Sequence, residues 1–172
     1  MPSLTELASY LESIAPAQIA ESWDNVGVLV RCAQEVTGVL CALDITPATV
    51  REARAVGCNA IVSHHPVIFR PLKELRQDDV PALLVREGVS AVCMHTNLDK
   101  AQGGVNDVLA QALGLNKDEI AVVGDNENDL SMFRVIPASY CIDHAAPTIQ
   151  AAASHSVATV AQALALAREI KG

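Results

Sequence analysis

Apolar and polar residues alternate along this chain with two periods, one typical of strands and one of amphipathic helices. Short apolar runs rich in Val, Ile and Leu predict strands. Longer stretches with apolar residues three and four positions apart predict helices. The predicted strands are 26–30, 36–44, 58–65, 89–95, 119–125 and 139–143, and the predicted helices are 3–16, 46–57, 80–88, 104–115, 128–136, 146–154 and 160–170.

This order of elements predicts the fold class. Strands separated by helices imply right-handed crossovers and a mostly parallel sheet. The length of 172 residues suits one buried core. Because 51% of the residues are hydrophobic but only 3% aromatic, the core should consist of Val, Leu, Ile and Ala. We therefore expect an α/β fold, with a mostly parallel, Rossmann-like sheet covered by helices on both faces in a single three-layer domain over residues 1–172.

Charge and cysteine content limit the partners and the compartment. A net charge of −8 opposes binding to nucleic acid or to anionic membranes. No apolar run is long enough to span a bilayer, and the N-terminus has the pattern of an amphipathic helix rather than of a signal peptide. The cysteines are odd in number, lack C-x-x-C spacing and lie mostly in apolar runs, which favours reduced thiols in the cytoplasm. They are Cys32, Cys41, Cys58, Cys93 and Cys141.

Metal-binding side chains follow several of the predicted strands. In a parallel sheet the carboxyl ends of the strands share one edge, where α/β proteins bind ligands. Imidazole nitrogen and carboxylate oxygen suit Zn, Mn, Fe, Co or Ni. The alternative for each histidine alone is a capped residue at the edge of the core. The strand ends carry Asp44, His64 and His65, His95 with Asp99, Asp125, and Asp143 with His144, of which His64, His65, His95 and Asp99 are the candidate ligands.

A second candidate site lies where the strand 119–125 gives way to a helix. Asp125 and Asp129 are four residues apart, so that both carboxylates can face one point, as a Mg²⁺ site requires. Helix capping by the same residues is an equally good interpretation. Trp23 and Asp24 precede a strand, where a turn and core anchor is favoured over a site. No serine nucleophile elbow, phosphate-binding Walker loop or Cys–His pair is evident.

The first two thirds of the chain resemble a known family. The segments "SWDNVGVLV", "ALDITPATVREA", "AIVSHHPVIF" and "MHTNLDKAQGGVNDVLAQALGL" are similar to those of the GTP cyclohydrolase 1 type 2 homologues, the Ngg-interacting-factor-like dinuclear-metal family. The resemblance covers roughly residues 1–115. It implies that His64, His65 and Asp99 are ligands of a two-metal centre, with His95 as a further or supporting ligand. That family also uses a "GHH…E"-like segment, which this sequence lacks.

The remaining residues, roughly 116–172, resemble a different family. "DEIAVVGDNENDLSMFRV" and "ASYCIDHAAPTIQAAASHSV" are similar to the C-terminal part of haloacid-dehalogenase-like phosphatases. This resemblance implies that Asp125 and Asp129 bind magnesium. The superfamily's D-x-D nucleophile motif is absent, since only Asp44 is present in "CALDIT", so aspartyl-phosphate chemistry is not expected.

Two incomplete sets of motifs suggest recombination. We therefore expect an engineered chimera, a de novo protein with partial metal sites and no efficient catalysis of its own. The alternative is a metal-dependent hydrolase acting on a phosphate ester or a nucleotide, in which Asp125 and Asp129 join His64, His65 and Asp99 around a metal-activated water. A small phosphorylated ligand and a homo-oligomer are the partners we expect.

Overall fold

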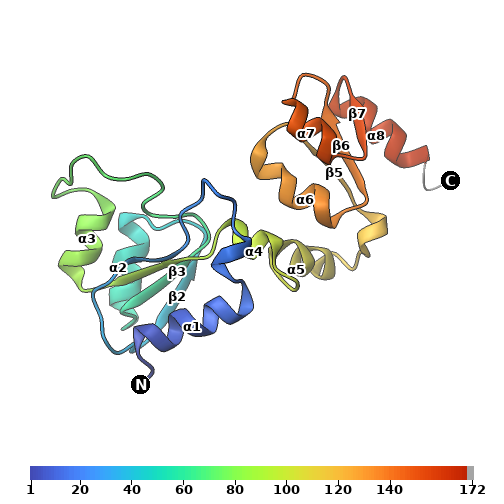
Figure 1. The fold of residues 1–172 in the computed structure, drawn as a ribbon. Coiled ribbons are helices and arrows are strands. Elements are labelled where there is room, and N and C mark those ends of the chain that lie inside the picture. Colours follow the sequence, from blue (N-terminus) through green and yellow to red (C-terminus); the bar gives the residue numbers. More distant parts are fainter. Residues whose placement is uncertain (170–172) are drawn as a thin grey trace. The chain divides into compact units, whose positions relative to one another are not determined.

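The computed structural model describes residues 1–169 and divides into two compact units (Figure 1). The first unit comprises Met1–Ala101, and the second begins at Gln102. Each unit has its own sheet, with strand order β1-β4-β3-β2 in the first and β5-β6-β7 in the second. Each unit is therefore a small α/β assembly with its own core.

The first unit places three parallel strands beside one antiparallel edge strand. β2 pairs with β3 and β3 with β4 in parallel, whereas β1 pairs with β4 in the antiparallel direction. A short 3₁₀ helix at Ala17–Ile19 follows α1. The elements are α1 (Leu4–Ile14), β1 (Gly27–Val30), β2 (Val39–Ala42), α2 (Pro47–Ala55), β3 (Ala60–Ser63), α3 (Val80–Glu87), β4 (Ser90–Cys93) and α4 (Thr96–Lys100).

Local sequence signals fix the ends of these helices. The Ser3 hydroxyl accepts a hydrogen bond from the Glu6 backbone N–H, and the Glu6 carboxylate accepts one from the Ser3 backbone N–H, which completes a capping box for α1. Thr46 caps α2, with Pro47 at the first helical position. Gly88 follows the last residue of α3 and caps the helix, with a φ of 67°, a left-handed conformation that glycine adopts without strain.

The side chains of β3 point alternately to the two faces of this sheet, and helices cover both faces. Ala60 and Val62 pack on the side of α1, where they contact the cluster built around Leu4. Ile61, between them, points to the opposite side and packs with Leu84 of α3 and the cluster that includes α2. Successive side chains of a strand point to opposite faces, so one strand serves two cores. The unit therefore has three layers.

The second unit repeats this plan on a smaller scale. Its three strands are all parallel. One core, which includes Phe133 and Ile149, lies on one side of the sheet, and another, around Tyr140 and Ala163, lies against α8. The elements are α5 (Val105–Ala112), a 3₁₀ turn at Lys117–Glu119, β5 (Ala121–Gly124), a 3₁₀ turn at Glu127–Asp129, α6 (Leu130–Val135), β6 (Ala138–Ile142), α7 (Pro147–Ala152), β7 (His155–Val157) and α8 (Val160–Glu169).

The predicted α/β class, with mainly parallel strands covered by helices, is confirmed, but the expected single sheet is wrong. β5 pairs only with β6 among the described strands, so the sheet does not continue across residues 116–121. α4 and β7 were not predicted, and β1 runs antiparallel. The last residue of the predicted helix 160–170 lies outside the described residues. Within residues 1–169, no helix has the length and hydropathy to cross a membrane.

Candidate metal centre

Three histidines meet at the carboxyl edge of the first sheet. β3 ends at Ser63 and β4 at Cys93, and these two residues are partners in the parallel register. His64 and His65 therefore leave the sheet beside His95. Their ring centroids are 5.2 Å apart for His64 and His65, 5.2 Å for His64 and His95, and 5.8 Å for His65 and His95. Two neighbouring strands thus bring together the imidazoles that the sequence predicted as ligands.

The hydrogen bonds of the three rings prepare them to bind a cation. The Nδ1 atom of His64 lies 3.0 Å from the carbonyl oxygen of Met94, that of His65 lies 2.7 Å from Asp44 Oδ1, and that of His95 lies 2.8 Å from Asp24 Oδ1. Since these oxygens are acceptors, each Nδ1 is the donor of its hydrogen bond, which leaves Nε2 as the ring nitrogen that can bind a cation. One ring nitrogen from each histidine lies within 4.8 Å of the others. Such a set suits a divalent transition metal.

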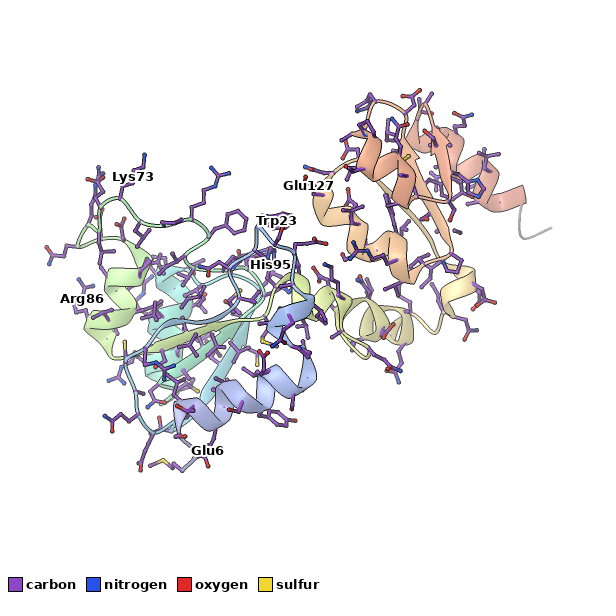
Figure 2. The ribbon with its side chains drawn as sticks, viewed as in Figure 1. Glu6, Trp23, Lys73, Arg86, His95 and Glu127 are labelled. Carbon is purple, nitrogen blue, oxygen red and sulfur yellow. The ribbon has the colours of Figure 1, made fainter. Side chains whose placement is uncertain are left out.

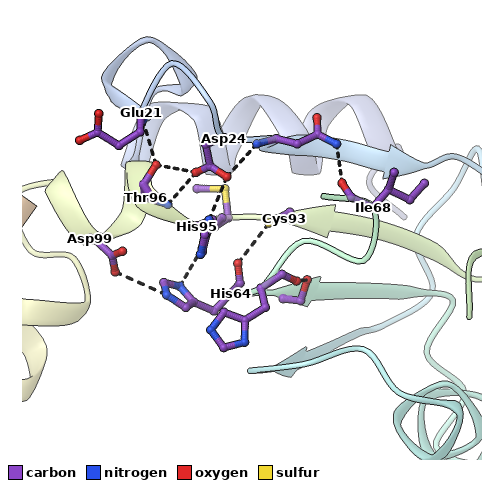
Figure 3. Close-up of polar contacts among 12 residues, drawn as sticks. Glu21, Asp24, His64, Ile68, Cys93, His95, Thr96 and Asp99 are labelled. Atoms are coloured by element: carbon purple, nitrogen blue, oxygen red, sulfur yellow. Dashed lines mark hydrogen bonds and ion pairs between the residues drawn. The ribbon is translucent and has the colours of Figure 1, made fainter. Parts of the chain in front are cut away.

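Asp24 is the most deeply placed partner of this cluster (Figure 3). Its side chain is 0% exposed and accepts from His95, from the backbone N–H of Thr96 at 3.0 Å, from the Thr96 hydroxyl and from the Asn25 N–H at 2.7 Å. Burial alone would raise the pKa of Asp24, but these hydrogen bonds together outweigh it and lower the pKa. Asp24 is therefore a buried carboxylate that fixes the orientation of His95.

Asp99 adds a carboxylate from α4. Its Oδ1 lies 3.5 Å from Nε2 of His64, and Figure 3 draws this contact at the side of the cluster. Burial raises the pKa of Asp99, and electrostatic interaction with the neighbouring His64 and His95 offsets part of that rise. A cation among these rings would favour the charged carboxylate. Asp99 can thus complete a set of three imidazoles and one carboxylate, all within the first unit.

The carboxylates of the second unit have a different surrounding. Asp129 Oδ2 accepts hydrogen bonds from the backbone N–H groups of Asp125 at 2.9 Å and Asn126 at 3.0 Å, in a capping box with Asn126. The Asp125 carboxylate lies 3.9 Å from Nε2 of the exposed His144. Gly124 permits this arrangement, because a Cβ there would lie 2.3 Å from Cγ of Asp129. The geometry agrees with helix capping, and magnesium binding by Asp125 and Asp129 stays a prediction.

Two supporting residues were not assigned to the site from the sequence. Asp24 was interpreted as a turn anchor, but it is the hydrogen-bond acceptor of His95. Asp44, placed correctly at the sheet edge, is the acceptor of His65. Asp24 and His95 are 71 residues apart in the sequence, and Asp44 and His65 are 21 residues apart, so no local sequence pattern reveals either hydrogen bond. The glycines at 103 and 104 belong to a turn in which Gly103 donates to Asp107 at 2.7 Å.

Comparison with known proteins gives the relationships of the chain. The family model Duf34/NIF3 (NGG1p interacting factor 3) matches residues 2–171. The chain is similar to a "GTP cyclohydrolase 1 type 2 homolog" of Staphylococcus aureus strain MRSA252, with 40% identity over 129 residues, 73% of this chain and 35% of the relative. A relative of the same name from Staphylococcus epidermidis strain RP62A is 35% identical over 147 residues, 81% of this chain and 39% of its own length. The chain thus spans little more than a third of these relatives.

Solved structures show similarity to proteins of the same kind. A crystal structure of a Staphylococcus aureus hypothetical protein has 42% identity and a TM-score of 0.61, over 66% of this chain and 39% of that one. A Bacillus cereus protein related to NIF3 has 39% identity and a TM-score of 0.61, over 67% of this chain and 33% of that one. Protein ybgI, at 16% identity and a TM-score of 0.63 over 98% of this chain and 83% of its own, shares the fold.

These comparisons overturn the chimera hypothesis. The family model runs through the supposed junction near residue 117 without a break. The Staphylococcus epidermidis relative aligns with 81% of the chain, which is more than residues 1–116 can provide. The interpretation as an engineered or de novo hybrid is therefore wrong, and residues 116–171 are matched by the same family model as the residues before them. The chain belongs to the Duf34/NIF3 family.

Proposed function

We propose that the protein is a metal-dependent hydrolase that acts on a phosphate ester or a nucleotide. His64, His65, His95 and Asp99 would hold a divalent ion. The observation that carries this proposal is the orientation of the three imidazoles, each of which donates through Nδ1 to an oxygen and keeps Nε2 for a ligand. Histidines that served only the core edge would not require three separate acceptors behind them.

The donor set supports a transition metal rather than an alkaline-earth ion. Three imidazole nitrogens and one carboxylate suit Zn, Mn, Fe, Co or Ni, whereas Mg prefers oxygen ligands alone. When bound, such an ion lowers the pKa of a coordinated water and polarises a phosphoryl oxygen. The name of the Staphylococcus relatives, GTP cyclohydrolase 1 type 2 homolog, makes GTP a reasonable substrate to test. The chain spans about a third of those relatives, 35% and 39% of their length, so GTP turnover enters here only as a proposal for this chain.

The protein's own groups have separate tasks in this proposal. Asp24 holds His95 and, through the Thr96 N–H, the first turn of α4 that carries Asp99. Asp44 holds His65 at the exposed side of the cluster, where the side chains of Asp44 and His65 are 57% and 47% exposed. The inner side is therefore fixed by buried bonds, and the outer side is open to solvent. A substrate would approach from this outer side.

Metal analysis tests the proposal. Bound metal is first removed from the purified protein with a chelator and dialysis, and the protein should then bind added Zn²⁺ or Mn²⁺. His65→Ala should reduce both the metal content and the turnover of p-nitrophenyl phosphate or GTP. His144→Ala, at an exposed histidine of the second unit, is the matched control and should behave like the wild type. Absence of any bound transition metal in the wild type, or an equal loss in both variants, would overturn the proposal.

A further inference from the structure

Two aromatic side chains lie beside the histidine cluster. The chain has only one Trp, two Tyr and two Phe. Trp23 and Phe69 nevertheless both contact His95, with ring centroids 6.4 Å from the imidazole in each case and 6.0 Å from one another, in edge-to-face geometry. Figure 2 shows Trp23 next to His95 at the upper side of the first unit. In a protein so poor in aromatic residues, this placement requires an explanation.

Core packing does not provide one. Phe69 is 42% exposed, and Trp23 is half-buried. Neither ring belongs to any of the hydrophobic cores of the described residues, although Val67 and Ile68, just before Phe69, pack against one of them. Phe133 and Tyr140, by contrast, are 5% and 0% exposed and lie within cores. Large aromatic surface left in contact with water at a ligand site is available for binding.

The two rings are also held in place relative to the histidines. Asn25 Nδ2 donates to the carbonyl oxygen of Ile68 at 2.5 Å, which links the turn after Trp23 to the segment that carries Phe69. The Asp24 carboxylate between Trp23 and Asn25 is bonded to His95 and Thr96. The main-chain positions of both aromatic residues are thus tied to the cluster. A fixed position lowers the entropy that binding costs.

We propose that Trp23 and Phe69 form a stacking surface for the planar base of a nucleotide substrate. The proposal rests on the function proposed above, because it assumes that the phosphate of the same molecule lies at the histidine cluster. A single sugar separates base from phosphate in a nucleotide, so one ligand can reach both the cluster and the adjacent rings. Stacking on aromatic side chains recognises the π face of any base. The two rings would therefore favour nucleotides over phosphate esters without a planar ring.

Trp23 offers a direct probe, because it is the only tryptophan of the chain. The metal-loaded protein is titrated with AMP, GMP and ribose 5-phosphate, and tryptophan fluorescence is corrected for absorption by the base. AMP and GMP should change the emission and bind more tightly than ribose 5-phosphate. Phe69→Leu keeps an apolar side chain but removes the ring. Tyr10→Leu is the matched control, since Tyr10 is an aromatic residue of α1 with 64% exposure.

The outcomes separate this inference from the proposed function. Phe69→Leu should raise the Kd for AMP and GMP by about thirtyfold, the middle of the range for loss of one base–aromatic contact, and leave the affinity for Zn²⁺ unchanged. Tyr10→Leu should change neither. Equal affinity for AMP and ribose 5-phosphate, or unchanged nucleotide binding in Phe69→Leu, would overturn the stacking surface even if metal-dependent hydrolysis is found. Nucleotide binding that depends on Phe69 without any hydrolysis would support the stacking surface and refute the hydrolase.

Discussion

Replacing Asp24 by asparagine tests how far the metal cluster depends on one buried carboxylate. Oδ1 accepts from His95 and from the Asn25 N–H, and Oδ2 accepts from the N–H and the hydroxyl of Thr96. Asparagine has nearly the same shape, but one of its two positions is an NH₂ group that cannot accept. Whichever way the amide is turned, it faces at least one backbone N–H, of Asn25 or of Thr96, that then lacks its acceptor.

The contacts give the size of the effect. A buried donor left without a partner costs about 1–3 kcal/mol, and hydrogen bonds to a charged group contribute about 1.5–3 kcal/mol each. With the side chain 0% exposed, no water replaces the lost acceptor, so we expect Asp24→Asn to lower the free energy of unfolding by about 2–4 kcal/mol. His95 also loses the anion that fixes its tautomer. Loss of such a supporting group weakens metal binding by roughly 10–100-fold.

Asp44→Asn is the matched control. Asp44 is bonded to His65 at 2.7 Å, but its side chain is 57% exposed, so that water can replace the lost bond. A surface pair of this kind contributes about 0–1 kcal/mol. Urea unfolding of the metal-free proteins measures stability, and competition against a coloured zinc chelator measures affinity. If Asp24→Asn loses no more stability or zinc affinity than Asp44→Asn, the reasoning that places Asp24 at the base of the cluster is refuted.

Three further results are expected. Gly124→Ala should destabilise the protein by about 1–3 kcal/mol in thermal unfolding, because the added Cβ meets the Asp129 carboxylate, and the double variant with Asp129→Ala should lose less than the sum of the two single variants. Tyr140→Phe should be neutral or stabilising by about 1 kcal/mol in urea unfolding, since the fully buried hydroxyl has no hydrogen-bond partner among the described residues. The pKa of Asp24 in the folded protein is below its ordinary 3.8, so the stabilisation by the charged carboxylate should be complete well above pH 3.8 and decline as the pH falls below that value. The difference in unfolding free energy between wild type and Asp24→Asn should therefore shrink as the pH is lowered through this range. A difference that stays constant would contradict the lowered pKa.

The sequence predicted the elements better than their assembly. Each predicted strand and helix has a counterpart, because hydrophobic period, caps such as Thr46 and terminal glycines such as Gly88 are local signals. β7 was missed because three residues at His155–Val157 have no recognisable alternation and are held by pairing with β6. Separation into two sheets was also missed, since strand pairing is decided by tertiary contacts that the order of elements does not contain.

Only part of the candidate site could be predicted from the sequence. Histidines at strand ends were recognised because the βαβ order predicts parallel strands whose carboxyl ends share one edge. The register of β3 and β4 in the structure then brings His64 and His65 beside His95. The residues behind them could not be found in this way. Asp24 lies in a turn before an antiparallel edge strand, and its contact with His95 exists only because β1 pairs with β4.

The mistaken chimera has a physical cause in one short stretch, "GDNEND". This stretch resembled a phosphatase motif because its carboxylates are spaced for a magnesium site. In the fold the same spacing serves the start of a helix: Asp129 accepts the N–H groups of Asp125 and Asn126, and Gly124 has no Cβ that would collide with it. Any chain that turns from a strand into a helix must satisfy these free N–H groups, and an acidic residue one turn into the helix does so. A strand, a glycine and two aspartates four apart can therefore arise from backbone capping alone, whereas three imidazoles with three separate acceptors have no such local cause.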